Sequence, residues 1–461
     1  MAIEDVLATW LGDQRWFAGK GQGLHDLAIV ADTELVAGEP GLRHLIVAAT
    51  HGTAVDYYQI LVGLRQRLPV RLQHVRIGPS GDGRIAYDAL HDAELTKTLL
   101  AGIAAGGKAG PLRMGTISGT SFATGLDSLV LAGEQSNTSL VFGDESILKV
   151  FRRLSPGPNP DLEVTTALAR LGSEQIAEPL GYIETSLEGV TTSLAILSHY
   201  LRLATDGWTL AATSVRDLYA RAGDMSQPDM SQPDTGRGSM HAEDAGGDFA
   251  GESRRLGIAT AAVHSDLAAA FGTEELGSDE IVELSEQMFR KLDLTVAAVP
   301  ELAKHTDMIS DAYHQVAKLR GPVPVQRVHG DYHLGQVMRT ENGWVVLDFE
   351  GEPATPLVQR RALSSPLRDV AGMLRSFDYA SRYQLIGHPE EAALSEVARD
   401  WERRNASAFC AGYAEAGGLD PFANQVLLRA LQLDKAVYEV LYEARHRPSW
   451  LPIPLDSLTE F

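Results

Sequence analysis

The sequence predicts an α+β protein in which a sheet-rich part precedes a mainly helical part. Short apolar runs separated by turn residues fill positions 128–198 and predict antiparallel strands. Apolar residues at helical spacing dominate from position 254 onward. At roughly 150 residues per domain, the 461 residues suggest two or three lobes. We therefore expect an N-terminal subdomain at 1–110, an antiparallel-sheet lobe at 111–205 and a mainly helical lobe at 206–461.

Composition narrows the classes of function. The net charge of −21 disfavours binding to nucleic acid or to an anionic membrane through the overall field. Cys410 is the single cysteine, which excludes an intrachain disulfide and a multi-cysteine zinc site. The N-terminal stretch is too acidic and mixed for a signal peptide, and no apolar run approaches the ~20 residues of a membrane span. We expect a cytoplasmic protein.

The predicted N-terminal subdomain mixes helices and strands. "IEDVLATWLGD" at 3–13 has helical spacing, and 44–64 is typical of two strands around Gly52-Thr53. The segment 88–107 predicts a helix that ends at two glycines. This pattern indicates a small α+β subdomain.

The sheet lobe has the clearest local pattern. "SLVLAGEQSNTSLVFGDESILKVFRR" at 128–153 alternates apolar runs with two turns and predicts three antiparallel strands. "NPDLEVTTALARLG" follows with Pro160 and acidic residues in its first turn, as helix starts prefer. Two further strands fit 178–198.

The helical part contains an unusual insertion. Residues 222–253 carry a tandem MSQPD repeat and are rich in Gly, Ser, Asp and Pro. Such a composition buries too little apolar surface to offset the entropy of ordering, which predicts a flexible insertion between two helices.

Two aspartates in "HGDYHLGQVMRTENGWVVLDFEGEP" carry the main chemical hypothesis. Asp331 follows an apolar run and a glycine, where a loop carboxylate can orient and deprotonate a hydroxyl. Asp348 follows "GWVVL", so a buried strand is expected to deliver it, and Gln336 adds an amide oxygen. Carboxylate and amide oxygens suit Mg²⁺. This division of labour is that of kinase-type phosphoryl transfer.

The same residues also allow interpretations without phosphoryl transfer. Either aspartate alone could cap a turn. Transition-metal ligands could also have the every-second-residue spacing of His329, Asp331 and His333. Further ligands at supporting spacings are not evident. Phosphoryl transfer is favoured because three features occur together in order. These are His-Gly-Asp, a glutamine five residues after Asp331, and a second aspartate seventeen residues after Asp331.

A phosphotransferase also needs a nucleotide-binding part earlier in the chain. Lys149 lies inside an apolar strand, and Glu163 follows on the predicted helix, as a phosphate-positioning Lys–Glu pair requires. Small polar residues in the preceding turn can cover phosphates, and the chain after the last strand is expected to meet the adenine ring. The further nucleotide-binding candidates are Ser136, Asn137, Thr138, Ser139, Ser198 and Tyr200.

Several segments together resemble a known family. "QRWFAGK", "HGDYHLGQV", "WVVLDFEGEP", "SPLRDVAGMLRSFDY" and "ARHRPSWLPIPL" resemble the maltokinases of actinobacteria, in the aminoglycoside-phosphotransferase-like branch of the protein-kinase fold. The resemblance implies a bilobal fold with an N-terminal cap subdomain, and ATP-dependent phosphorylation of maltose at its anomeric hydroxyl. The product, maltose 1-phosphate, would feed α-glucan synthesis. The roles implied are a catalytic base for Asp331, Mg²⁺ ligands for Gln336 and Asp348, nucleotide positioning for Lys149 and Glu163, and support of the catalytic loop for Asp369.

A helix near the C-terminus offers candidate sugar contacts. "LDKAVYEVLYEARHRPSW" places a polar and aromatic stripe on one helical face, which suits the apolar faces and hydroxyls of a sugar. An ordinary amphipathic helix with a solvated face is the alternative. The candidates on the stripe are Lys435, Tyr438, Glu439, Tyr442 and His446, and those elsewhere are His333, Glu350, Glu352, Arg375 and Trp450.

Three other functions remain open at this point. A related sugar or aminosugar kinase, for example one for glucosamine, would use the same machinery, and the acidic Glu352, Glu439 and Glu443 would welcome an ammonium group. A non-catalytic pseudokinase should have lost Lys149, Asp331 or Asp348, and all three are present. A partnership with a trehalose-handling enzyme is compatible with activity.

Overall fold

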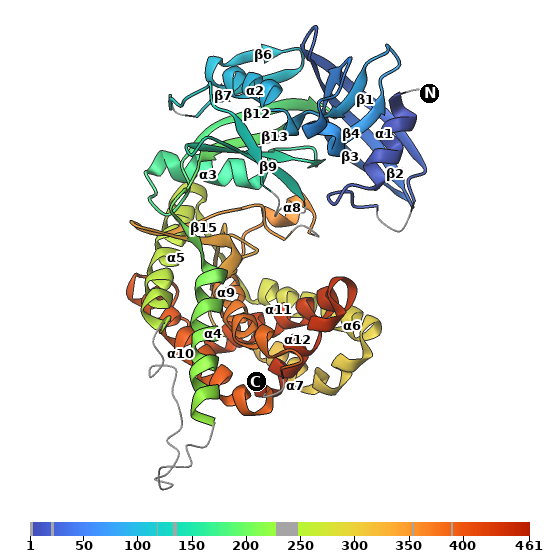
Figure 1. The fold of residues 1–461 in the computed structure, drawn as a ribbon. Helices are drawn as coiled ribbons and strands as arrows, with labels where there is room; N and C mark the ends of the chain where they lie inside the picture. Colours follow the sequence, from blue (N-terminus) through green and yellow to red (C-terminus); the bar gives the residue numbers. More distant parts are fainter. Residues whose placement is uncertain are drawn as a thin grey trace. The chain divides into compact units, whose positions relative to one another are not determined.

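The chain forms two compact units in the computed structural model (Figure 1). The first comprises Met1–Arg170 and Ala177–Arg202, and the second comprises Leu171–Ile176 and Leu203–Phe461. The described residues are 3–19, 23–117, 119–131, 136–226, 248–352, 355–388 and 391–461.

A six-stranded antiparallel sheet begins the first unit. Its strands lie in the order β1, β2, β3, β5, β4, and β11 also pairs with β3. Helix α1 (Ile3–Gly12) packs against β1 and β4. The strands are β1 (Asp26–Val36), β2 (Gly41–His51), β3 (Ala54–Arg65), β4 (Arg76–Pro79), β5 (Ile85–Asp88) and β11 (Arg153–Leu154).

A seven-stranded antiparallel sheet completes the first unit, in the order β6, β7, β12, β13, β10, β9, β8. Helix α2 (Ala93–Ala105) packs against β7, β8 and β12, and α3 (Pro160–Leu171) follows β11 (Figure 1). The strands are β6 (Gly107–Ala109), β7 (Leu112–Thr116), β8 (Ser128–Val130), β9 (Asn137–Phe142), β10 (Ser146–Phe151), β12 (Pro179–Leu187) and β13 (Val190–His199).

A buried polar contact joins the two sheets. The Gln59 side chain on β3 donates to the backbone oxygens of Phe151 and Leu194, at 2.7 and 2.6 Å. His44 on β2 lies 3.0 Å from the Gln59 amide oxygen and therefore donates to it through Nε2. Burial lowers the pKa of His44 to about 4, so its neutral form is the one that fits this joint.

Local sequence patterns located most elements of this unit correctly. The helices predicted at 3–13 and 88–107 correspond to α1 and α2, and the hairpin at 44–64 corresponds to β2 and β3. The three strands predicted at 128–153 are β8, β9 and β10. The predicted subdomain boundary after residue 110 falls inside the seven-stranded sheet, in the turn between its first two strands, β6 and β7.

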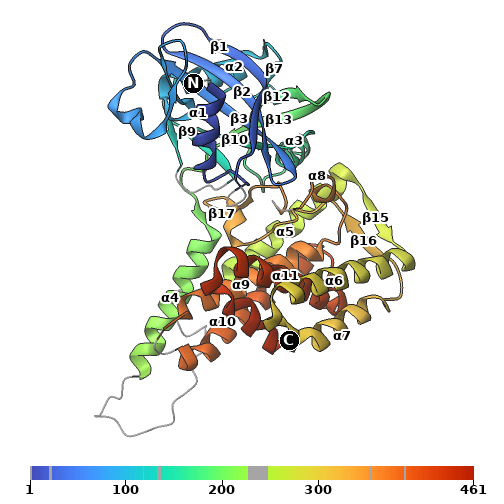
Figure 2. The same cartoon turned by 90° about the vertical axis from the view of Figure 1, so that its right-hand side faces the viewer.

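The second unit is mainly helical (Figure 2). Helix α9 packs against α4, α10 and α11, and α10 also packs along α5. None of the helices in the described ranges has both the length and the apolar character needed to cross a membrane. The helices are α4 (Gly207–Ser226), α5 (Ala250–Phe271), α6 (Ser278–Ala298), α7 (Thr306–Val316), α8 (Leu357–Arg360), α9 (Leu367–Arg382), α10 (Glu391–Glu415), α11 (Gln425–His446) and α12 (Pro452–Ser457).

Two small antiparallel sheets interrupt these helices and frame the candidate site. One contains β14 (Thr205–Asp206), β17 (Val337–Thr340) and β18 (Gly343–Val346), and the other pairs β15 (Thr273–Leu276) with β16 (Val323–Gln326). The loop 327–336 therefore leaves one sheet and enters the other.

The insertion predicted at 222–253 is shorter than expected at both ends. Helix α4 continues to Ser226 and α5 begins at Ala250, because the sequence on either side keeps its helical character. Met225 and Ser226, the first two residues of the repeat, end α4, and the rest of the repeat lies outside the described residues.

Candidate active site

Asp369 at the start of α9 holds the loop that carries Asp331. Its Oδ2 accepts from the backbone N–H of His329 at 2.7 Å, and its Oδ1 accepts from that of Gly330 at 2.9 Å. Gly330 has a φ of 85°, a left-handed conformation that favours glycine. The loop conformation is thus fixed directly before Asp331.

A histidine supports this anchor from behind. His264 on α5 donates through Nε2 to Asp369 Oδ2 at 3.0 Å, and its Nδ1 accepts from the Tyr413 hydroxyl at 2.8 Å. Burial alone would raise the pKa of Asp369, but its hydrogen bonds and its histidine neighbours lower it, so the carboxylate stays ionised. The buried anchor therefore accepts three hydrogen bonds as an anion.

Asp331 lies in a charged cluster with two residues from other segments. Lys435 Nζ on α11 is 3.2 Å from Asp331 Oδ1 and 2.8 Å from Glu352 Oε1. Burial would raise the pKa of Asp331, but the Lys435 ammonium together with His333 and His329 lowers it below its ordinary value. The Asp331 side chain is 23% exposed, so an ionised carboxylate remains within reach of an acceptor hydroxyl.

His333 and Gln336 connect this loop to the second predicted aspartate. The His333 Nδ1 accepts from the backbone N–H of Gly335 at 3.0 Å and so caps the short 3₁₀ turn Leu334–Gln336. Burial lowers the pKa of His333, which keeps the ring neutral for this role. Gln336 then donates to Asp348 Oδ2 at 3.2 Å.

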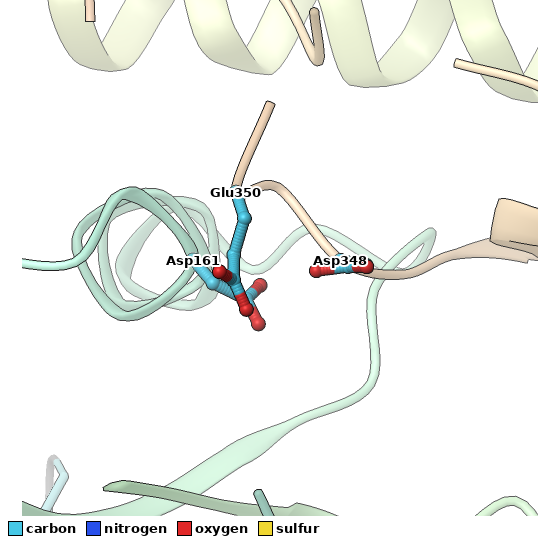
Figure 3. A group of neighbouring side chains, drawn as sticks. All are labelled: Asp161, Asp348 and Glu350. Atoms are coloured by element: carbon cyan, nitrogen blue, oxygen red, sulfur yellow. The ribbon is translucent and has the colours of Figure 1, made fainter. Parts of the chain in front are cut away.

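Asp348 and Glu350 form an oxygen-rich group on the loop after β18 (Figure 3). Their carboxylate oxygens lie within 4.8 Å of one another, and the Gln336 amide adjoins Asp348. Hard oxygen ligands of this kind are those that Mg²⁺ takes from proteins. The residues present therefore fit the ion expected from the sequence, with Gln336, Asp348 and Glu350 as its candidate ligands.

One face of the seven-stranded sheet carries three of the candidate nucleotide residues, Lys149, Ser139 and Ser198. Ser139 stands directly opposite Lys149, and Ser198 stands opposite Ile147, two residues from Lys149. Directly opposed residues in antiparallel strands point to the same face. The other face, which carries Leu148 and Val150, belongs to the hydrophobic core.

Lys149 has a partner that the sequence did not predict. Its Nζ forms an ion pair at 3.2 Å with Asp161 Oδ2, two residues before the expected Glu163 on α3. Asp161 is buried, whereas Glu163 is half-buried. Sequence reasoning missed Asp161, although it lies on the buried stripe of α3 formed with Val164, Thr165 and Leu168.

The predicted phosphate-covering turn is mostly strand. Only Ser136 lies outside β9, while Asn137, Thr138 and Ser139 begin that strand and are buried. The Thr138 hydroxyl accepts from the buried guanidinium of Arg152 at 2.8 Å, on the face opposite Lys149, so the prediction is corrected for this residue.

Tyr200 lies on the segment that leaves the first unit. It follows β13, and its backbone N–H donates to the Glu145 oxygen at 2.9 Å. The unit ends two residues later at Arg202. The segment therefore runs where the sequence placed the connection between lobes.

The C-terminal helix presents the predicted aromatic stripe. The rings of Tyr438 and Tyr442 stack at 6.1 Å between centroids, and those of Tyr442 and His446 stack at 4.5 Å. Lys435 lies over the Tyr438 ring at 4.7 Å from its centroid. Trp450 packs against Tyr379 and Tyr383 at the end of the stripe.

Arg375 and Glu439 form an internal ion pair, whereas the sequence suggested that both contact a sugar. Arg375 is 2% exposed, and its guanidinium lies 2.7 Å from Glu439 Oε2 and 3.1 Å from Asp378 Oδ2. It also donates to the Ser457 hydroxyl at 2.8 Å. These hydrogen bonds and ion pairs join α9, α11 and α12, and they give Arg375 a structural role.

Comparison with known proteins identifies relatives of the whole arrangement. Residues 10–92 match the maltokinase N-terminal cap domain. The chain is 31% identical over 340 residues to a glucosamine kinase of Streptacidiphilus jiangxiensis, covering 71% of this chain and 72% of the relative. It is 29% identical over 334 residues to a glucosamine kinase of Mycolicibacterium smegmatis, covering 70% and 77%.

Solved structures show the same fold. A glucosamine kinase in complex with glucosamine, ADP and inorganic phosphate superposes with a TM-score of 0.66 at 25% identity, covering 98% of both chains. A second crystal form of glucosamine kinase gives a TM-score of 0.68 at 24% identity, covering 99% of this chain and 98% of the other. The predicted α+β, protein-kinase-like architecture is confirmed.

Proposed function

Because this chain belongs to the family of cap-bearing sugar kinases related to maltokinase and glucosamine kinase, we propose that it phosphorylates maltose at the anomeric hydroxyl with ATP. It is a sugar kinase by family. The choice of maltose and of its anomeric hydroxyl rests on the resemblance of its motifs to those of maltokinases. Maltose 1-phosphate would then be a donor for α-glucan synthesis.

The observation that carries the proposal is the position of Asp331 beside α11. An ionised, partly exposed carboxylate stands on a loop fixed by Asp369, within one lobe that also presents the stack of Tyr438, Tyr442 and His446. Aromatic faces next to a few placed polar groups are typical of small-molecule sites. This combination supports a sugar hydroxyl as the phosphoryl acceptor.

The residues of this chain would act mainly by position and charge. Asp331 accepts a hydrogen bond from the acceptor hydroxyl and takes its proton as that oxygen bonds to the γ-phosphorus, while the bond from phosphorus to ADP breaks. Gln336, Asp348 and Glu350 would hold Mg²⁺, which supplies charge neutralisation on the phosphates. Lys149, oriented by Asp161, would neutralise charge on the remaining phosphates of the nucleotide.

Glucosamine is the second candidate substrate, because the relatives named above, in sequence and in fold, are glucosamine kinases. ADP release and product NMR with maltose, glucose, glucosamine, trehalose and an aminoglycoside distinguish the two. Phosphate on C1 of maltose supports the proposal. If glucosamine alone is turned over efficiently, glucosamine replaces maltose as the proposed substrate.

The role of Asp331 has its own test. We expect Asp331→Asn to lower kcat by roughly a hundredfold to ten-thousandfold, the range for loss of a general base, with ATP affinity nearly unchanged. Asp420→Asn, at an exposed turn of the same unit, serves as the matched control and should retain wild-type kcat. A loss of less than about tenfold in Asp331→Asn would reject the base assignment.

A further inference from the structure

The sequence suggested that three acidic residues could bind the ammonium group of a substrate. In the structure, all three already have cationic partners inside the protein. Glu439 pairs with Arg375 at 2.7 Å, and Glu443 pairs with Arg447 at 2.6 Å. Glu352 pairs with Lys435 at 2.8 Å, and Arg368 lies 3.5 Å from its other oxygen. The negative charge beside the candidate sugar site is therefore compensated internally.

Lys435 is the cation that matters most for the substrate, because it also touches Asp331. Its Nζ lies 3.2 Å from Asp331 Oδ1, and its side chain is 20% exposed, so it borders the space that an acceptor hydroxyl must enter. A lysine ammonium has three N–H donors. Two serve Asp331 and Glu352, and the third is left for an oxygen of the sugar.

We propose that Lys435 selects neutral sugars against sugars that carry an ammonium group, a conclusion that rests on the proposed sugar kinase function. Lys435 occupies the position between two carboxylates that a substrate ammonium would need. A cationic sugar close to Asp331 would meet a fixed like charge, and like charges across an interface suppress the wrong partner. A neutral sugar instead offers oxygen atoms that can accept from Lys435.

Glucose and glucosamine form a matched pair for the test, because they differ only in the group on C2. The measured quantity is the ratio of kcat/KM for glucosamine to kcat/KM for glucose. We expect a low ratio in the wild type and an increase of about tenfold or more in Lys435→Met, which removes the like charge. Both rates can fall in this variant because Asp331 loses its partner, but the ratio cancels a loss that the two sugars share.

Two further variants separate charge from structure. Lys291→Met removes the ion pair between Lys291 Nζ and Asp434 Oδ2, 2.6 Å apart and next to Lys435 on α11, and should leave the ratio unchanged. Lys435→Met leaves the carboxylates of Asp331 and Glu352 without their lysine. The double variant Lys435→Met/Glu352→Gln removes one of these negative charges, so its ratio should be lower than in Lys435→Met alone. An unchanged ratio in Lys435→Met would overturn the proposal.

The wild type alone provides a test that does not depend on variant folding. As pH rises and the sugar ammonium loses its proton, the same ratio should increase, because Lys435 stays charged in its carboxylate pair. A ratio that is already high at neutral pH, or that falls with rising pH, would contradict selection against the cation. If ADP is released with none of the sugars, the proposed sugar kinase function is wrong. If the enzyme is active but the ratio is the same in Lys435→Met, only the role of Lys435 is wrong.

Discussion

Replacing Asp369 by asparagine tests how the catalytic loop is held. In the wild type the buried carboxylate accepts from His329 N–H, Gly330 N–H and His264 Nε2. Asparagine has one acceptor oxygen and one donor group. In either orientation of the amide, its NH₂ group faces at least one of these three donors.

The energetic cost depends on how many of the three hydrogen bonds the amide breaks. A hydrogen bond to a charged group contributes roughly 1.5–3 kcal/mol, and a buried donor without an acceptor costs roughly 1–3 kcal/mol more. If the amide breaks one or two of these bonds, we expect Asp369→Asn to lower the free energy of unfolding by about 3–5 kcal/mol. That is a large share of the roughly 5–15 kcal/mol that is typical of folded domains.

In Asp369→Asn, kcat should fall by more than the loss of folded protein explains. A displacement of about 1 Å in a catalytic group can cost roughly a hundredfold in rate. We therefore expect kcat of the folded variant, measured by ADP release at low temperature, to drop by about that factor. Urea unfolding followed by circular dichroism gives the stability and the folded fraction.

Asp378→Asn is the matched control for this experiment. Asp378 is also buried on α9, but its ion pairs are with Arg375 and Arg382, which lie outside the catalytic loop. It should lose stability while the folded fraction keeps its kcat. If Asp369→Asn likewise kept kcat within about threefold of the wild type, the anchoring of Asp331 by Asp369 would be refuted.

Two predictions concern the first unit. Lys149→Met should lower kcat/KM for ATP, because it removes the cation that Asp161 orients; unchanged ATP kinetics would remove Lys149 from the site. The folded pKa of His44 is about 4 against 6.5 for the free side chain, so its contribution is complete above pH 6.5 and is lost as pH falls towards 4. The loss amounts to about 3 kcal/mol, and His44→Gln should flatten this part of the profile of urea midpoint against pH; an unchanged acid slope would show that other groups cause it.

The sequence was sufficient wherever a structure depends on neighbouring residues. Strand and helix periodicity located β8, β9, β10 and α3, and Gly52-Thr53 correctly marked a two-residue hairpin turn. These features need only local patterns and turn chemistry. The loop at 329–336 was recognisable for the same reason, since its residues are contiguous.

Side-chain partners were less predictable because they depend on how elements pack. The contact between Asp161 and Lys149 was not predicted, because the residues of α3 that face the sheet depend on the rotation of the helix against it. The buried positions Asp161, Val164 and Thr165 follow the helical repeat and contained that information.

Arg375 shows the same limit at long range. Its partners Glu439 and Ser457 lie 64 and 82 residues further along the chain. An arginine within a helix gives no local signal of burial. Only the packing of α9 against α11 and α12 turns this residue from a candidate ligand contact into an internal ion pair.

Asp348 combines a predictable chemical role with an unpredictable backbone. Strand β18 ends at Val346, earlier than the apolar run suggests, and Asp348 has a φ of 62°. This left-handed conformation is uncommon for residues other than glycine, although aspartate tolerates it better than most.

The residues on both sides explain why the conformation is kept. The Leu347 oxygen accepts from His329 Nε2 at 2.8 Å, and the Phe349 ring packs on His329 with 5.0 Å between centroids. Because both neighbours of Asp348 are fixed to the same histidine, the chain has to reverse within one residue. His329 also belongs to the loop that carries Asp331, so one ring links the candidate base to the candidate Mg²⁺ ligand. The strained backbone at Asp348 is thus maintained by the packing that positions both carboxylates, as expected where strain is retained at a functional site.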